Sequence, residues 1–84
     1  MRKLEIFTQD GCSYCVRAKM LYLSKKEMFD QYFEYNISQD SDSKTKLLEM
    51  NPEAKTVPQI FINDNYVGGY SEFGDWIDNH YSGS

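Results

Sequence analysis

Short apolar stretches alternate with amphipathic ones along the first half of the chain. A strand is expected over residues 2–7, where an alternating pattern becomes apolar, and a second over 32–37, where apolar and polar residues alternate. Between them, residues 13–27 carry apolar side chains at helical spacing and basic residues on the opposite side, which predicts an amphipathic helix. Because a helix joins these two strands, we expect them to pair in parallel.

The second half predicts two further helices and a hairpin. A short helix over 44–50 is expected to stop before Pro52, and strands over 59–62 and 66–67 are joined by a tight turn of polar residues. Ser71 is expected to cap the last helix. The side chains that share the apolar face of this helix are Phe73, Trp76, Ile77 and His80.

The resulting order is β-α-β-α-β-β-α. It predicts an α/β fold with one four-stranded mixed sheet and three helices packed on it. The 84 residues contain no repeat or linker and are expected to form a single domain, 1–84. Aromatic residues make up 15% of the chain, and each buries a large apolar area. This burial helps so short a chain to offset the conformational entropy that it loses on folding.

The charge and the hydropathy pattern narrow the classes of partner. A net charge of −4 disfavours nucleic acids and anionic membranes, since binding to both depends on clustered positive charge. No apolar run approaches the ~18 residues of a membrane span, and there is no basic-then-apolar leader. We therefore expect a soluble, cytoplasmic protein without nucleic-acid or membrane partners. The candidates for a local basic patch are Arg17, Lys19, Lys44, Lys46 and Lys55.

The candidate chemistry lies in Cys12-Ser13-Tyr14-Cys15, which follows the first predicted strand and opens the first helix. The thiolate is the attacking species in disulfide exchange, and a free cysteine, with a pKa of ~8.5, is mostly protonated at neutral pH. Unpaired N–H groups and the macrodipole at a helix start favour the thiolate, so Cys12 is predicted to be the nucleophile. Cys15 lies on the same helix face one turn deeper, where it can close a disulfide with Cys12.

Two other interpretations of a Cys-x-x-Cys pair are half of a metal site and two small core residues. A zinc site needs two further ligands, whereas the chain has no third cysteine and a single histidine, His80. In a reducing compartment a cysteine pair is more often catalytic or metal-binding than a permanent structural bridge. Its position between a strand and a helix favours redox chemistry.

Four motifs together resemble the glutaredoxins, a family of small thiol-disulfide oxidoreductases with the thioredoxin fold. They recur in the family's order over essentially the whole chain, as Cys12-Ser13-Tyr14-Cys15, Arg17-Ala18-Lys19, Thr56-Val57-Pro58-Gln59 and Gly68-Gly69. The resemblance implies a thioredoxin-like (glutaredoxin) fold and a monomeric enzyme that reduces protein disulfides and protein-glutathione mixed disulfides. Glutathione would be a co-substrate, with no permanently bound cofactor.

The same resemblance implies how glutathione is held. Pro58 would be a cis proline that faces the dithiol, and Val57 would offer its backbone to the peptide. The γ-glutamyl carboxylate would bind at the start of the last helix, with Glu72 available to the ammonium group, and Lys55, with Lys46 as a weaker candidate, would bind the glycine carboxylate. The implied glutathione contacts are Tyr14, Lys55, Thr56, Val57, Pro58, Gly69, Tyr70 and Ser71.

Three positions depart from the family pattern. Gln9, followed by Asp10, stands where many members have a lysine, which removes one positive charge near the dithiol. Ser13 replaces the common proline of the motif and adds a hydroxyl and an N–H near Cys12, and either could stabilise the thiolate. Tyr70 stands where a third cysteine is frequent.

Two alternative functions follow from these departures. Ser13 favours a carrier of a [2Fe-2S] cluster bridged between two subunits, with two copies of Cys12 and two glutathiones as ligands. Gln9 favours a hydrogen donor for ribonucleotide reductase that a thioredoxin reductase recycles in place of glutathione. The run Gly68-Gly69-Tyr70-Ser71 argues against the second alternative, because it matches a glutathione site.

Overall fold

A computed structural model describes residues 1–81 of the chain. Its elements, in order, are β1 (Lys3–Thr8), α1 (Ser13–Ser24), a 3-10 turn (Lys26–Met28), β2 (Gln31–Asn36), α2 (Ser41–Met50), β3 (Gln59–Ile62), β4 (Asn65–Gly68) and α3 (Tyr70–His80). The predicted order β-α-β-α-β-β-α is therefore confirmed. None of the helices in this part of the chain is long and apolar enough to cross a membrane.

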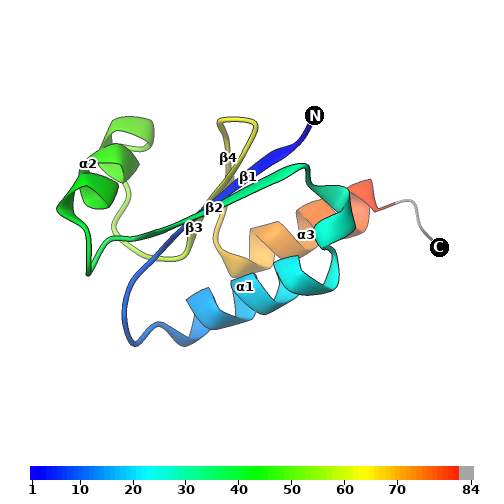
Figure 1. Cartoon of the computed structure of the whole chain (residues 1–84), viewed down its shortest axis with the longest axis horizontal. Coiled ribbons are helices and arrows are strands. Elements are labelled where there is room, and N and C mark those ends of the chain that lie inside the picture. Colours follow the sequence, from blue (N-terminus) through cyan, green and yellow to red (C-terminus); the bar gives the residue numbers. More distant parts are fainter. Residues whose placement is uncertain (82–84) are drawn as a thin grey trace.

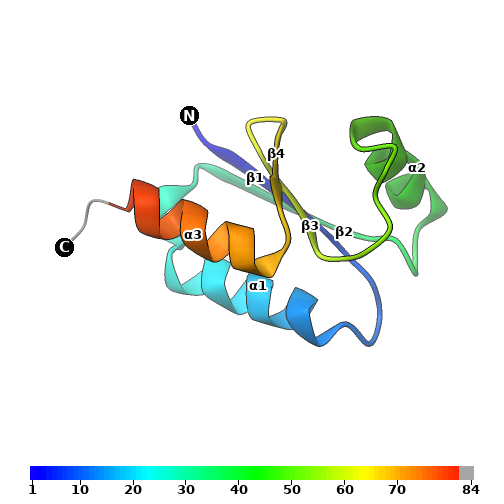
Figure 2. The ribbon, with the colours of Figure 1, turned by 180° about the vertical axis from the view of Figure 1, so that it is seen from behind.

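The four strands form one mixed sheet in the order β2-β1-β3-β4. β1 pairs in parallel with β2, as predicted, and antiparallel with β3, which pairs antiparallel with β4. Figures 1 and 2 show α1 and α3 side by side below the sheet, while α2 stands at the far end, on the other side of the strands. The loop of residues 9–12 joins the carboxyl end of β1 to the start of α1.

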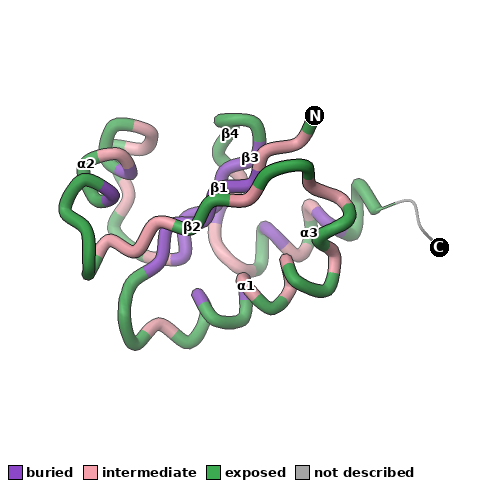
Figure 3. The backbone as a smooth tube through the Cα atoms, in the orientation of Figure 1, coloured by how far each residue is buried: buried purple, intermediate pink, exposed green. Residues whose placement is uncertain are grey.

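The alternation of side chains along the strands builds two separate clusters. One face of the sheet packs against α1 and α3, and its buried residues are Leu4, Ile6, Ala18, Ile60, Ile62, Phe73 and Ile77. On the other face, Phe7 and Phe61 pack against Leu47 of α2. Figure 3 shows the buried positions concentrated in the central strands. Burial on both faces of β1 fixes the end of this strand, from which the Cys-containing loop leaves.

Two helix ends differ from the sequence-based prediction. α1 ends at Ser24 instead of residue 27, because the hydroxyl of Ser24 donates to the carbonyl of Leu21 and the chain continues as a 3-10 turn. α2 begins at Ser41 instead of residue 44. Asp40 caps this earlier start, since its carboxylate accepts from the N–H of Asp42 at 3.1 Å.

The prediction that Ser71 caps the last helix was wrong. Gly69 is the N-cap, and α3 begins one residue later, at Tyr70. The carboxylate of Glu72 reaches back and accepts from the N–H of Gly69 at 2.8 Å, which satisfies a donor at the helix start without a side chain at the cap.

Gly68 allows β4 to pass directly into α3. Its φ is +133°, and a Cβ built on it would lie 2.7 Å from both Cβ and Cγ of Glu72. The Cβ of Glu72 is fixed by the helix, so it cannot move aside. Gly11, which precedes the dithiol, also has a positive φ of +73°, but a Cβ there would meet nothing within 4 Å.

These two glycines make a matched test of close packing. We expect Gly68→Ala to lower the free energy of unfolding by about 3 kcal/mol or more, because strain at positive φ adds to a steric clash. Gly11→Ala should cost only about 1 kcal/mol, from the backbone strain alone. Urea denaturation followed by circular dichroism measures both values. Equal losses would contradict the close approach of Gly68 and Glu72.

Candidate functional site

The two cysteines lie at the start of α1, as the sequence predicted. Cys12 is the N-cap of the helix, and its sulfur accepts from the N–H of Cys15 at 3.1 Å. The two residues form a disulfide, with their Cα atoms 5.2 Å apart. Cys12 is partly exposed, whereas Cys15 is buried, with 4% of its surface exposed. An incoming sulfur can therefore reach Cys12 more readily than Cys15.

Asp10 fixes the loop that carries Cys12. Its carboxylate oxygen Oδ1 accepts from the amide of Asn36 and from the amide of Gln39, both at 3.0 Å, and its N–H donates to the hydroxyl of Ser38 at 3.1 Å. These bonds tie the loop to the connection between β2 and α2. The sequence showed Asp10 only as a departure from the family pattern, and this bracing role was missed.

The Val57-Pro58 segment, which directly precedes β3, lies next to the dithiol. The peptide bond is cis, as predicted, and the carbonyl oxygen of Val57 lies 3.7 Å from the sulfur of Cys12. The buried side chain of Gln59 braces this loop, since its amide donates to the carbonyl of Thr56 at 2.7 Å. The sequence gave no signal for this role of Gln59 beyond its position in the motif.

A groove of about 220 Å³ lies between Tyr14, inside the dithiol motif, and the start of α3. It is lined by Tyr14, Thr56, Val57, Pro58, Gly69, Tyr70, Ser71 and Glu72. All the predicted glutathione contacts except Lys55 are therefore brought together. The rings of Tyr14 and Tyr70 lie 6.0 Å apart across this groove, and the guanidinium of Arg17 lies 5.2 Å from the Tyr14 ring. Tyr14, which is 54% exposed, thus forms part of a wall.

A second groove, of about 270 Å³, continues from Thr56 and Val57 toward α2. It contains Lys55, the remaining predicted contact, and also Lys44 and Gln9. Because Thr56 and Val57 line both grooves, the two form one continuous surface beside Cys12. From the sequence, Lys44 was only one of several candidates for a basic patch. Leu48, four positions further along α2, also lines this groove, and residues four apart lie on the same side of a helix. This spacing is the signal that could have identified Lys44.

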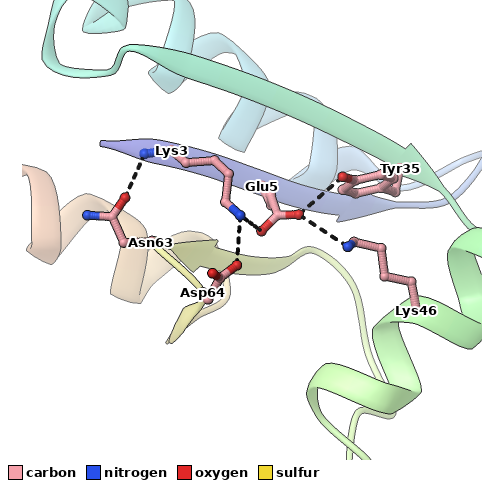
Figure 4. Close-up of polar contacts among 6 residues, drawn as sticks. All are labelled: Lys3, Glu5, Tyr35, Lys46, Asn63 and Asp64. Carbon is pink, nitrogen blue, oxygen red and sulfur yellow. Dashed lines mark hydrogen bonds and ion pairs between the residues drawn. The ribbon is translucent and has the colours of Figure 1, made fainter. Parts of the chain in front are cut away.

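Lys46 does not join this surface, which corrects its assignment as a second glycine-carboxylate contact. Its ammonium lies 3.7 Å from Oε2 of Glu5, a carboxylate that is buried within β1, and 5.4 Å from the ring of Tyr35. Figure 4 shows Lys46 reaching from α2 to this carboxylate. The reason is helical geometry, since positions 44 and 46 lie on different sides of α2.

Three residues around Glu5 have shifted pKa values, namely Lys3, Tyr35 and Asp64. Burial, together with the hydrogen bond to Glu5, raises the pKa of Tyr35, so its hydroxyl keeps its proton and donates to Glu5 at 3.1 Å. Lys3 lies 2.8 Å from Asp64 and 3.7 Å from Glu5. The hydrogen bond with Lys3 lowers the pKa of Asp64, and the same bond raises the pKa of Lys3. This cluster links α2 and the β3-β4 turn to β1, away from the dithiol.

Metal ligands do not gather in the part of the chain that the structure describes. Residues 1–81 contain no group of three or more histidine, cysteine, aspartate or glutamate side chains placed to hold a metal ion. His80 stacks on Trp76, with ring centroids 4.1 Å apart, and its ring nitrogen Nδ1 contacts the carbonyl of the same residue. The structure therefore gives no support to the iron-sulfur hypothesis.

Comparison with known proteins agrees with this geometry. The family model for glutaredoxin matches residues 4–67, which is most of the chain. The chain belongs to the glutaredoxin family. It is 39% identical over 75 residues to glutaredoxin 1 of Escherichia coli, covering 86% of this chain and 88% of that protein. It is accordingly a thiol-disulfide oxidoreductase with a redox-active dithiol.

Solved glutaredoxin structures show the same fold. The structure of reduced Escherichia coli glutaredoxin matches with a TM-score of 0.73 and 34% identity, covering 93% of this chain and 95% of that one. A buckwheat glutaredoxin-glutathione complex matches with a TM-score of 0.69 and 26% identity, covering 93% of this chain and 70% of that one.

Proposed function

We propose that this glutaredoxin reduces protein disulfides and protein-glutathione mixed disulfides, with glutathione as the source of electrons. The observation that carries the proposal is the continuous surface on which two grooves meet beside Cys12 and the cis Pro58. A peptide with a central sulfur and a carboxylate at each end fits the chemistry of this surface. The buckwheat complex, in which a related chain binds glutathione, supports the assignment.

Each part of glutathione has a matching group on the surface. Its sulfur would lie at Cys12, and its cysteine backbone would pair with Val57 in the manner of an added strand. The γ-glutamyl carboxylate would bind the N–H groups of Tyr70 and Ser71 at the start of α3, where the helix dipole favours negative charge. Glu72 uses Oε1 on the N–H of Gly69, which leaves Oε2 for the ammonium group.

The glycine carboxylate would lie in the second groove, between Lys44 and Lys55. Two ammonium groups can bind one carboxylate through charge-assisted hydrogen bonds. They also supply positive charge on the side of the dithiol where Gln9 replaces the lysine of many relatives.

Reduction of a glutathionylated protein needs Cys12 alone. The Cys12 thiolate attacks the glutathione sulfur of the mixed disulfide, a Cys12-glutathione bond forms, and the protein thiolate leaves and takes up a proton. A second glutathione thiolate then attacks the glutathione sulfur bound to Cys12. The products are the Cys12 thiolate and glutathione disulfide, so the two electrons come from glutathione.

Reduction of a protein disulfide also needs Cys15. Cys12 attacks one substrate sulfur and forms a mixed disulfide, and Cys15 then attacks the sulfur of Cys12 and releases the substrate thiolate. The product is the Cys12-Cys15 disulfide seen in the structure, which two glutathione molecules return to the dithiol. In this proposal the protein acts as a monomer in the cytoplasm, and its protein partners include ribonucleotide reductase.

Exchanging each cysteine separately tests these roles. With glutathione as reductant, we expect Cys12→Ser to abolish both reactions, since no other thiol takes its place at the helix start. Cys15→Ser should keep the removal of glutathione from a glutathionylated protein and lose the reduction of a protein disulfide. Initial rates of glutathione disulfide formation measure both reactions.

Activity in Cys12→Ser would refute the assigned nucleophile.

The same assay with a thioredoxin reductase in place of glutathione tests the alternative hydrogen donor. Recycling of the native protein by the reductase, together with no recycling by glutathione, would replace the proposed function with that alternative.

Lysine variants test the second groove. We expect Lys44→Gln and Lys55→Gln each to raise the KM for glutathione about two- to fivefold, which corresponds to the loss of one exposed ion pair. Lys46→Gln is the matched control, because it removes the same charge from the same helix but faces Glu5. An effect of Lys46→Gln as large as that of Lys44→Gln would contradict this placement of the glycine carboxylate.

A further inference from the structure

A third cavity opens on the β2 side of the dithiol, away from the β3 and α3 residues that line the glutathione surface. It has a volume of about 410 Å³, and its lining includes Cys12, Cys15, Lys19 and Glu34. Nothing in the proposed reaction with glutathione uses Lys19 or Glu34. The buried Cys15 thus lines this cavity together with polar side chains.

Lys19 and Glu34 form an ion pair in this cavity. The ammonium of Lys19 lies 2.8 Å from Oε1 of Glu34. Lys19 follows Cys15 by four positions on α1, so the two share one helix face, and helical side chains point back toward the N-terminus. Lys19 therefore lies one turn beyond Cys15 on the same side of α1, and its partner Glu34 lines the same cavity as Cys15.

The register of the sheet places Glu34 toward α1. Glu34 of β2 pairs with Ile6 of β1, whose side chain belongs to the cluster beneath α1 and α3. The hydroxyl of Thr8 donates to Oε2 of Glu34 at 3.2 Å, which fixes the second carboxylate oxygen. The side chain of Glu34 is 29% exposed, so water in the open cavity can reach it.

The other titratable groups around the cavity are less suited to accept a proton. Tyr32 lies two positions from Glu34 on the same face of β2 and does not line the cavity. Burial, with a smaller effect of the Glu34 charge, raises the pKa of Tyr32, so its phenol stays protonated. Lys19 is already an ammonium in its ion pair. Asp10, on the loop, accepts two amide hydrogen bonds at Oδ1. Glu34 is the remaining carboxylate that lines the cavity together with Cys15.

The resolving step needs such an acceptor. Cys15 has to lose a proton before it attacks Cys12, and a thiol buried at 4% exposure is harder to ionise than an exposed one. The N-cap position that favours a thiolate belongs to Cys12 and not to Cys15. A general base within reach, or one water molecule away, removes this obstacle.

We propose that Glu34, held in place by Lys19 and Thr8, accepts the proton of Cys15 through a water molecule in this cavity during the resolving step. The inference rests on the proposed function, in which Cys15 resolves the mixed disulfide. The S–H bond of Cys15 breaks and its electron pair forms the bond to the sulfur of Cys12. The bond from Cys12 to the substrate sulfur breaks, the substrate leaves as a thiolate, and the proton on Glu34 passes to it through solvent.

A rapid-mixing experiment separates the two steps. The reduced protein is mixed with a peptide disulfide and quenched with acid, and mass spectrometry follows the mixed disulfide on Cys12 and the later Cys12-Cys15 disulfide. In Glu34→Gln we expect an unchanged first step and a resolving step slowed about tenfold or more at about pH 6.5, which is a modest general-base effect. The difference should shrink above about pH 9, where a free thiol ionises without help.

Asp42→Asn is the comparison, because it removes one negative charge from an exposed side chain that does not line the cavity. It should leave the resolving rate unchanged, and Glu34→Asp, which keeps a carboxylate, should recover part of the rate. If Glu34 acted only by repelling the Cys15 thiolate, Glu34→Gln would instead speed the resolving step.

An unchanged or faster resolving step in Glu34→Gln, an equal slowing in Asp42→Asn, or a slowing of both steps in Glu34→Gln would each overturn the proposal. These results are distinct from a failure of the proposed function. That failure would appear in the native protein, as a first step at Cys12 that does not occur or a product that glutathione does not recycle.

Discussion

The hydrogen bond from the N–H of Cys15 to the sulfur of Cys12 is the interaction on which the site depends. It exists because Cys12 occupies the N-cap of α1, where the first backbone N–H groups have no partner within the helix. A sulfur in this position is stabilised when it carries negative charge, by direct hydrogen bonding and by the helix dipole. The same geometry leaves Cys12 partly exposed and Cys15 buried, so one backbone arrangement separates the attacking sulfur from the resolving one.

The rest of the fold keeps this helix start beside the surfaces that its chemistry needs. β1 is buried on both faces along most of its length, and this fixes the point from which the dithiol loop departs. Asp10 braces the loop on one side, and Gln59 braces the Val57-Pro58 segment on the other. Gly68 lets α3 start close to that segment, which brings its N-terminal N–H groups to the groove. The proposed glutathione surface lies on the Val57 side of Cys12, and the open cavity that Lys19 and Glu34 line lies on the β2 side.

The sequence predicted the order of elements, the sheet and the position of the dithiol, because each depends on local patterns. The strand at Gln59–Ile62, bounded by Pro58 and a polar turn, was placed at its observed limits. Features that depend on how elements face one another were harder to predict. Lys44 and Lys46 differ only in the side of α2 on which they lie, and the cap of α3 depends on Glu72 reaching back to Gly69. The pair of Lys19 and Glu34 requires the register of β2 against β1, which no single stretch of sequence reveals.

Titration of Cys12 tests the central claim most directly. In the reduced Cys15→Ser variant, whose backbone N–H at position 15 is retained, the ultraviolet absorbance of the thiolate reports the ionisation of Cys12 alone. We expect most of Cys12 to be ionised at about pH 7, where a free cysteine is mostly protonated. A sulfur that still carries its proton at about pH 8 would show that the helix start does not stabilise the thiolate, and would contradict the account.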